Sequence, residues 1–460
     1  MRRRLFLIAM GILAGCSGSS SDPVDRVDAV DAVEAVEVVD AVDTIDAVDA
    51  VELHEAFDPA LTSYTPGVEV RGNVKILRLK GTPYEMGRQH AQFLHDELVE
   101  GAQFLQTDPD FSLLEPLAVE NGYIDEATAQ SYEAIREECR GMADVAGAEG
   151  WTYERCIALA WGDVILENVG LGSISCSQFI ATGAATGGGE MVHGRNLDWD
   201  KIDFLLQHPT LIVRHPTGKI PYVVVGFPGN VATYNGINAA GISCGSNQNH
   251  AKPEELGRAG RSEIQMLNEI LANATSLADI EAFFATEERT VGNNLVFADG
   301  DHDTGAVFEM TKYHLAQRKM DATGVVFATN HYIVPDMVQY GVEVPAGKST
   351  RSRFARLEEL LLPDGRETLY GTLDLASAVT VLRDRYNPLT MVTAPEDAFD
   401  DQGTIANNGC VYSIVFAPKR RAFWLASGDL PIPMNPYQGF TLDELFGDPD
   451  APAPDPAQIP

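Results

Sequence analysis

The sequence lacks the motifs of the common metal-dependent and cofactor-dependent enzymes. It contains no Gly-x-x-x-x-Gly-Lys-Ser/Thr phosphate loop, no Gly-x-Gly-x-x-Gly turn and no His-Glu-x-x-His pair. Its ten histidines show no spacing typical of metal ligands. We therefore expect no cofactor and no metal ion.

Basic residues and long apolar runs are also scarce. The chain carries 33 Lys and Arg against 67 Asp and Glu, a formal net charge of −34. A field of this sign repels nucleic-acid backbones, so we expect no nucleic-acid partner. Beyond the amino terminus, no apolar run approaches the roughly 18 residues that a membrane span requires. We therefore expect no membrane-spanning segment.

The first sixteen residues follow the order of a signal peptide. Arginines at residues 2–4 precede an apolar run over residues 5–13, and residues 13–16 read Leu-Ala-Gly-Cys. This ending resembles the bacterial lipoprotein box, in which the cysteine is acylated and becomes the first residue. The resemblance implies lipidation at Cys16, with the lipid as the only membrane contact, and a place in the bacterial cell envelope. Ser17 favours the outer membrane, and an ordinary secretory signal is the alternative.

Two segments of biased composition flank a central region. Residues 17–56 include ten tandem triplets, each an apolar residue followed by an acid. This period suits neither a helix nor a strand, so we expect an extended acidic tether, with a small solenoid as the alternative. Residues 447–460 are rich in Pro and Asp and have no periodic apolar face, which is typical of a disordered tail.

No linker divides residues 68–440, so we expect a single domain there. Helical and strand patterns occur in separate blocks, which indicates an α+β fold with antiparallel sheets between helices. We expect helices at residues 83–98, 126–147, 262–271, 277–286, 352–361 and 373–384. We expect strands at residues 74–79, 177–181, 191–196, 210–215, 222–226, 242–245, 295–299, 306–311, 325–329, 410–416 and 422–427.

One of the six cysteines, Cys176, stands in an unusual setting. Small residues at 172–175 precede it, and an apolar strand follows it and turns through three glycines at 187–189. The returning strand of this hairpin would bring Arg195 and Asp198 beside Cys176. A guanidinium can stabilise a thiolate and a carboxylate can hold an amine, which are two needs of a cysteine nucleophile.

The remaining cysteines leave their state open. In an oxidising compartment they can form two disulfides, although the sequence does not give the pairing. Buried free thiols are an equally good interpretation. These residues are Cys139, Cys156, Cys244 and Cys410.

The segment around Cys176 resembles the N-terminal-nucleophile hydrolases, which include isopenicillin N acyltransferase, acid ceramidase and choloylglycine hydrolases. Further motifs similar to the isopenicillin N acyltransferase branch follow in order within residues 74–430. They lie at residues 80–90, 194–198, 292–294 with 298–299, 329–332 and 352–353. The resemblance implies a four-layer αββα sandwich and self-cleavage between Ser175 and Cys176.

The resemblance also implies catalytic roles. Cys176 would be the nucleophile, and the α-amine freed by cleavage would be its general base. An α-amine has a pKa near 8, so it can take the thiol proton near neutral pH. Arg195 and Asp198 would orient the thiol, the amine and the substrate. Ser352 and Arg353 match a pair linked in the family to maturation and site geometry.

The oxyanion donors implied by the resemblance are asparagines. The Asn330 side chain would donate one hydrogen bond to the oxyanion. Asn247 is the candidate for the second donor, although Asn238 and Asn249 lie nearby in the sequence.

Structural interpretations of the same residues stay open. Cys176 can be a core thiol or a disulfide partner. Arg195 and Asp198 can form a simple ion pair, and Asn330 can be a turn residue.

The expected activity is hydrolysis or transfer of the acyl group of a small N-acyl amide. An apolar acyl group is expected, because the residues that would wall the site, Trp199, 204–206 and 332–334, are apolar or aromatic. A lipase-like or phospholipase-like ester hydrolase of the same superfamily and a non-catalytic surface lipoprotein are the alternatives. The sequence leaves open the acyl and amine groups, hydrolysis against transfer, and the oligomeric state.

Overall fold

The computed structural model describes residues 64–108, 111–170, 175–199, 202–395, 403–448 and 450–460. These residues belong to one compact unit. The signal peptide, Cys16 and the acidic tether lie outside the described residues, so those expectations stay predictions.

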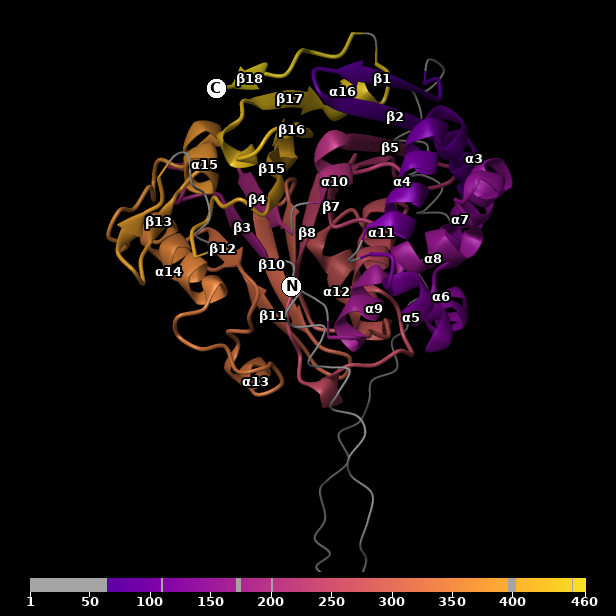
Figure 1. Cartoon of the computed structure of the whole chain (residues 1–460). Coiled ribbons are helices and arrows are strands. Elements are labelled where there is room, and N and C mark those ends of the chain that lie inside the picture. The colour runs from indigo at the N-terminus through magenta and orange to yellow at the C-terminus, as the bar shows by residue number, and fades with distance from the viewer. Residues whose placement is uncertain (1–63, 109–110, 171–174, 200–201, 396–402, 449) are drawn as a thin grey trace, which may run out of the picture. The chain divides into compact units, whose positions relative to one another are not determined.

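Two sheets form the centre of this unit (Figure 1). The first has nine strands in the order β1 (Gly67–Arg71), β2 (Val74–Gly81), β5 (Thr210–Pro216), β6 (Tyr222–Gly226), β7 (Asn235–Asn238), β8 (Ile242–Gln248), β9 (Asn293–Asp299), β10 (Thr304–Met310) and β11 (Leu315–Lys319). The second has seven strands in the order β12 (Val325–Ala328), β3 (Ser175–Ala181), β4 (Val192–Asp198), β15 (Cys410–Ala417), β16 (Ala422–Ala426), β17 (Tyr437–Thr441) and β18 (Gln458–Ile459). Among the described pairs, only β2 and β5 run parallel.

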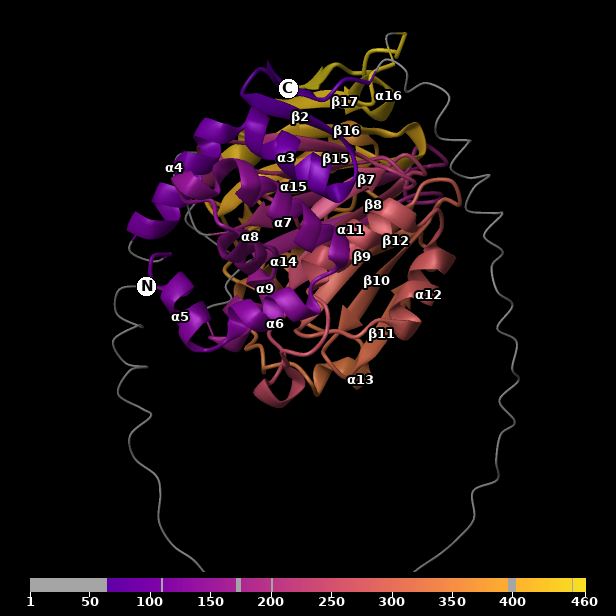
Figure 2. The same ribbon diagram turned by 90° about the vertical axis from the view of Figure 1, so that its right-hand side faces the viewer.

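Helices cover the outer face of each sheet (Figures 1 and 2). α3 (Pro83–Phe93), α11 (Glu263–Asn273) and α12 (Leu277–Thr286) share an apolar core with the nine-stranded sheet. α14 (Ser349–Leu361) and α15 (Leu375–Leu382) share another with the seven-stranded sheet. Apolar side chains of β3, β9, β10 and β12 fill part of the space between the two sheets. The expected α+β sandwich with four αββα layers is therefore confirmed.

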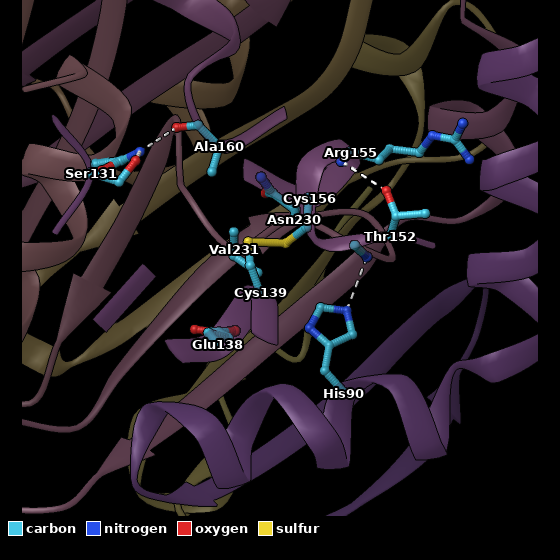
Figure 3. Close-up of a disulfide and its surroundings, with 12 residues drawn as sticks. His90, Ser131, Glu138, Cys139, Thr152, Arg155, Cys156, Ala160, Asn230 and Val231 are labelled. Carbon is cyan, nitrogen blue, oxygen red and sulfur yellow. Dashed lines mark hydrogen bonds between the residues drawn. A yellow bond between two sulfur atoms is a disulfide. The ribbon is translucent and has the colours of Figure 1, made fainter. Parts of the chain in front are cut away.

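A block of helices connects β2 of one sheet to β3 of the other. After α3 it comprises α4 (His95–Thr107), α5 (Leu114–Glu120), α6 (Tyr123–Gln130), α7 (Glu133–Ala146), α8 (Tyr153–Ala160) and α9 (Gly162–Asn168). A disulfide joins Cys139 of α7 to Cys156 of α8 (Figure 3). Cys244 and Cys410 are buried free thiols, so one of the two possible disulfides forms among the described residues.

Short elements complete the fold. They are α10 (Asp203–Gln207), α13 (Pro335–Val338), α16 (Leu442–Leu445) and the hairpin of β13 (Tyr386–Asn387) with β14 (Val392–Thr393).

The expectation of a disordered tail is wrong at the carboxyl end. Gln458 and Ile459 form β18, which pairs with β17, and Ile459 is buried. The indole of Trp424 donates a hydrogen bond to the carbonyl of Pro456 at 2.7 Å. The tail lacks a periodic apolar face, but backbone pairing and one buried side chain fix it against the sheet.

Candidate active site

Cys176 is the second residue of β3 and its side chain is fully buried. β3 lies between β12 and β4, and its pairing with β4 sets Ser175 opposite Asp198 and Cys176 opposite Leu197. The hairpin therefore brings Arg195 and Asp198 of β4 to the nucleophile candidate.

The Cys176 sulfur faces the guanidinium of Arg195. Nη2 of Arg195 lies 3.6 Å from the sulfur and 2.5 Å from the carbonyl oxygen of Ser246. Nη1 of Arg195 donates to the hydroxyl of Tyr412 at 3.0 Å. Burial raises the pKa of the Cys176 thiol, and the Arg195 charge opposes this rise. The sulfur is thus held as a thiol that needs a base to become a nucleophile.

Gly245 provides the space for Arg195. A β-carbon at this position would lie 2.8 Å from Cδ of Arg195 and 2.3 Å from the side-chain oxygen of Gln178. Only glycine leaves room for both side chains at this point of β8.

The backbone of Cys176 is held by side chains from two other segments. Oδ1 of Asn330 accepts a hydrogen bond from the Cys176 amide at 2.8 Å. Arg353 of α14 donates to the Cys176 carbonyl oxygen, to Oγ of Ser177 at 2.9 Å and to Oδ1 of Asn330 at 2.9 Å. Thr350, one turn earlier on the same helix, accepts from the Asn330 amide at 2.8 Å. The nucleophile is therefore fixed at its sulfur, its nitrogen and its carbonyl.

Asp198 supplies the acidic group of the site. It ends β4, is buried, and accepts a hydrogen bond from Nδ2 of Asn407 at 2.8 Å. Burial raises the pKa of Asp198 to about 6, although Arg353, Asn407, Arg195 and Cys410 each act to lower it. This carboxyl group consequently changes its charge within the physiological pH range.

The expected role of the Asn247 side chain requires a correction. Its Nδ2 donates to the carbonyl oxygens of Ala328 at 2.9 Å and Thr329 at 3.3 Å, and its Oδ1 accepts from Gln178. Both amide hydrogens are therefore used to join β8 to β12. Nδ2 of Asn330 likewise donates to the carbonyl oxygen of Gln248 at 2.8 Å. In this arrangement the Asn330 side chain holds the nucleophile through its oxygen.

Ser352 lies in the same helix as Arg353 but makes different contacts. Its hydroxyl lies within hydrogen-bond distance of two acceptors, Oδ1 of Asn387 at 2.8 Å and the carbonyl oxygen of Gly403 at 2.7 Å, and its single hydrogen can be donated to either. These contacts join α14 to β13 and to the segment that contains Gly403, whereas Arg353 contacts Cys176 directly. Among the other asparagines, Asn238 bonds to backbone groups near α11, and Asn249 bonds to Asn294.

Sequence reasoning did not identify Tyr412 and Asn407. Tyr412 orients Arg195, and Asn407 orients the Asp198 carboxylate. Both residues lie more than 200 positions from their partners in the sequence, and no local motif marks them.

Residues 241–245 read Gly-Ile-Ser-Cys-Gly, which matches the pattern of a serine-hydrolase nucleophile elbow. Ser243 of this run is hydrogen-bonded to Nδ1 of His193 at 2.8 Å. However, Ser243 lies inside β8, not at a strand-to-helix turn, and is fully buried. The other ring nitrogen of His193 contacts Gln178 instead of a carboxylate. This pair therefore lacks the geometry of a serine nucleophile.

An apolar cavity of about 110 Å³ lies next to this site. Its walls come from α4, α5, α8, α9 and residues 227–234, together with Phe111 and with Trp199, which follows β4. Two smaller cavities share Tyr234 with it, and one of them is also lined by Leu197 and Tyr412. Figure 3 shows Asn230 and Val231, two residues of the cavity wall, beside the disulfide.

The expected walls are present only in part. Trp199 lines the apolar cavity, and Leu205 lines one of the smaller cavities. Tyr332, in contrast, donates through its hydroxyl to the carbonyl of Met310, and residues 333–334 donate through their amides to Glu309. The segment 332–334 therefore packs against β10 and lines none of the three cavities.

The described residues hold no cluster of His, Cys, Asp and Glu that fits a metal ion. In the same part of the chain, no helix is long and apolar enough to cross a membrane.

The two facing sheets between helical layers define an αββα sandwich, the fold of the N-terminal-nucleophile hydrolases. The chain belongs to the acyl-coenzyme A:6-aminopenicillanic acid acyl-transferase family, which it matches over residues 185–430. The resemblance to the isopenicillin N acyltransferase branch is thereby confirmed.

Individual relatives are distant. An uncharacterized protein of Archaeoglobus fulgidus is 25% identical over 358 residues, which cover 66% of this chain and 57% of that protein. The chain thus spans little more than half the length of this relative.

Solved structures with a similar fold superpose on this chain with low TM-scores. An N-acylethanolamine-hydrolyzing acid amidase ortholog of Caenorhabditis elegans is 17% identical with a TM-score of 0.37, covering 53% of this chain and 93% of that one. A penicillin V acylase of Agrobacterium tumefaciens is 14% identical with a TM-score of 0.38, covering 60% of this chain and 90% of that one. A conjugated bile acid hydrolase mutant of Clostridium perfringens is 12% identical with a TM-score of 0.38, covering 59% of this chain and 94% of that one.

Proposed function

We propose that this protein is a cysteine amidase or acyltransferase that cleaves itself before Cys176 and then uses the Cys176 thiol to cleave N-acyl amides. The observation that carries the proposal is the threefold fixation of Cys176. Its sulfur faces Arg195, its amide nitrogen bonds to Asn330 and its carbonyl oxygen bonds to Arg353. A structural core thiol has no need for two buried guanidinium groups.

Self-cleavage converts this site into its catalytic form. The Cys176 sulfur attacks the carbonyl carbon of Ser175, the peptide C–N bond breaks, and the nitrogen becomes the α-amine of Cys176. Water then hydrolyses the resulting thioester between the Ser175 carbonyl and the Cys176 sulfur, which restores the thiol. Asp198 lies opposite Ser175 across the hairpin, where its carboxylate can accept a hydrogen bond from the new α-amine and orient it as a neutral base.

The same groups then act on the substrate. The α-amine takes the thiol proton as the sulfur attacks the substrate carbonyl, and it returns the proton to the leaving nitrogen. Water or a second amine removes the acyl group from the sulfur. The apolar cavity supports an apolar acyl group as the substrate class, because its wall consists mainly of aliphatic and aromatic side chains.

The test combines mass spectrometry with a substrate panel. Wild type should yield two fragments, and the 49.8 kDa of the 460-residue chain puts them at about 17 and about 31 kDa after signal removal. The Cys176→Ala variant should stay uncut and inactive. The panel contains N-acyl amino acids, N-acyl homoserine lactones, penicillins, bile-acid conjugates and ceramides, with simple esters and phospholipids beside them.

Two outcomes would contradict the proposal. A wild-type protein that is fully active but uncut would show that the proposed mechanism is wrong. If esters or phospholipids are hydrolysed and no amide is, the substrates are esters and the proposed substrate class is wrong.

We also propose that the enzyme is anchored in the bacterial cell envelope by lipid on Cys16, with residues 17–56 as its tether. The signal pattern of residues 1–16 supports this location. The disulfide between Cys139 and Cys156 supports export, because such bonds persist in oxidising compartments.

A further inference from the structure

Tyr234 occupies the junction between the nucleophile and the cavities. It precedes β7 and lines the apolar cavity and both smaller cavities. Tyr412, whose hydroxyl accepts a hydrogen bond from Arg195, lines one of the smaller cavities together with Tyr234. Ser246, whose carbonyl oxygen also accepts from Arg195, lines the other together with Tyr234. Tyr234 therefore borders the residues that fix the guanidinium beside the Cys176 sulfur.

The Tyr234 ring is rigidly held while its hydroxyl is not used. The ring packs edge-on against Trp199 at 5.5 Å, and the backbone carbonyl of Tyr234 accepts from the Ser246 amide at 2.9 Å. The side chain is more than nine-tenths buried. No hydrogen bond joins its hydroxyl to any residue in the described part of the chain, and the hydroxyl oxygen is not among the fully enclosed polar atoms there, so it is open to the cavity space. A ligand in the cavity would supply a hydrogen-bond partner.

The site also requires a further hydrogen-bond donor. Nδ2 of Asn247 donates to two backbone carbonyls, and Nδ2 of Asn330 donates to the Gln248 carbonyl. The asparagine side chains expected to stabilise an oxyanion therefore already have acceptors. Burial raises the pKa of Tyr234 far above neutrality, and the charge of nearby Asp163 acts in the same direction, so its hydroxyl remains a proton donor.

We propose that Tyr234 is a further catalytic residue, whose hydroxyl donates a hydrogen bond to the carbonyl oxygen of the substrate as negative charge develops on it. This inference rests on the function proposed above. When the Cys176 sulfur bonds to the carbonyl carbon, the π electron pair moves to the oxygen, and Tyr234 stabilises that charge while it keeps its proton. The pair returns to the carbon as the bond to the leaving group breaks.

The test uses Tyr234→Phe, which keeps the ring packed against Trp199 and removes only the hydroxyl. Acylation of Cys176 by p-nitrophenyl octanoate is followed by stopped-flow release of nitrophenolate, with intact mass confirming the acyl-enzyme. We expect the maximal acylation rate to fall about 100-fold, as for other lost oxyanion donors, with KM changed less than about threefold. Self-cleavage before Cys176 should proceed as in wild type.

Tyr64→Phe is the matched control. Tyr64 is buried, its hydroxyl bonds to the backbone carbonyls of Leu79 and Val213, and it lines none of the three cavities. This variant should be acylated at the wild-type rate.

The outcomes separate the two proposals. A wild type that is neither cut nor acylated on Cys176 overturns the proposed function together with this inference. If wild type is acylated, the inference alone is overturned by a Tyr234→Phe variant that is acylated equally fast, that changes only in KM, or that fails to cut itself.

Discussion

Three charged side chains surround the Cys176 thiol, and each is almost completely buried. They are Arg195, Arg353 and Asp198. Two positive charges against one negative charge leave an excess that a thiolate would neutralise. Burial and the charge of Asp198 raise the pKa of the thiol and so oppose the thiolate. The transfer of a proton from the sulfur to a nearby base is therefore the step that the two arginines must favour.

At the residue scale, the charge of Asp198 should control self-cleavage. The described chain is uncut, so the pKa of about 6 belongs to the precursor. Above this pH the carboxylate is charged and can draw the proton from the Cys176 thiol; below it, the protonated carboxyl cannot. We therefore expect the rate of self-cleavage to fall as the pH is lowered through about 6.

Refolding wild type at pH values from 4.5 to 8 and following the two fragments by mass spectrometry measures this rate. Asp198→Asn keeps the size of the side chain but has no titratable group, so it should stay uncut at every pH. A wild-type rate that is constant over this range, or that rises toward acid pH, would contradict the expectation.

At the scale of elements, the sequence located most of the inner strands and the longer helices. β6 and α12 have the predicted bounds, because the turn residues and the capping box of Ser276 with Asp279 mark their ends. The helix predicted over residues 126–147 is instead divided between α6 and α7. Gln265 of α11 bonds to Ser131 and to the Tyr132 amide at this break. Because Gln265 is far from Ser131 and Tyr132 in the sequence, no local sequence pattern marks the break between the two helices.

The disulfide between α7 and α8 should contribute measurably to stability. It closes a loop of 17 residues, and a loop of about 15 residues corresponds to about 3 kcal/mol. We expect the double variant Cys139→Ala/Cys156→Ala to lose about 2–4 kcal/mol of unfolding free energy. Urea denaturation with and without a phosphine reductant measures this loss.

The reductant provides the internal control for that experiment. It should destabilise wild type and leave the double variant unchanged. Cys244→Ala, which removes a buried free thiol, should keep the sensitivity of wild type to the reductant. If the double variant is as stable as wild type, the bond has no structural role.

At the scale of the whole molecule, the site is assembled from segments that are far apart in the sequence. The hairpin of β3 and β4 is local, so its glycine turn and strand pattern were sufficient to place Arg195 and Asp198 near Cys176. The contacts of Tyr412, Asn330 and Arg353 depend on how β15, β12 and α14 meet β3 and β4. Only the family resemblance indicated Asn330 and Arg353, and nothing in the sequence indicated that Asn247 would use its amide to join two sheets.

Attachment of the protein to the envelope is expected to depend on its amino-terminal residues. The chain as a whole has a net charge of −34, which opposes adsorption to anionic lipid. Attachment should therefore depend on the lipid at Cys16, and Cys16→Ser should move the protein from the membrane fraction to the soluble fraction. Deletion of residues 24–52 should leave membrane attachment, self-cleavage and thermal stability unchanged, because the proposed tether would only space the enzyme from the bilayer. Fractionation with mass spectrometry of the amino terminus measures both variants. A wild type found in the soluble fraction with an unmodified Cys16 would show that the arginines and the Leu-Ala-Gly-Cys ending act as an ordinary secretory signal.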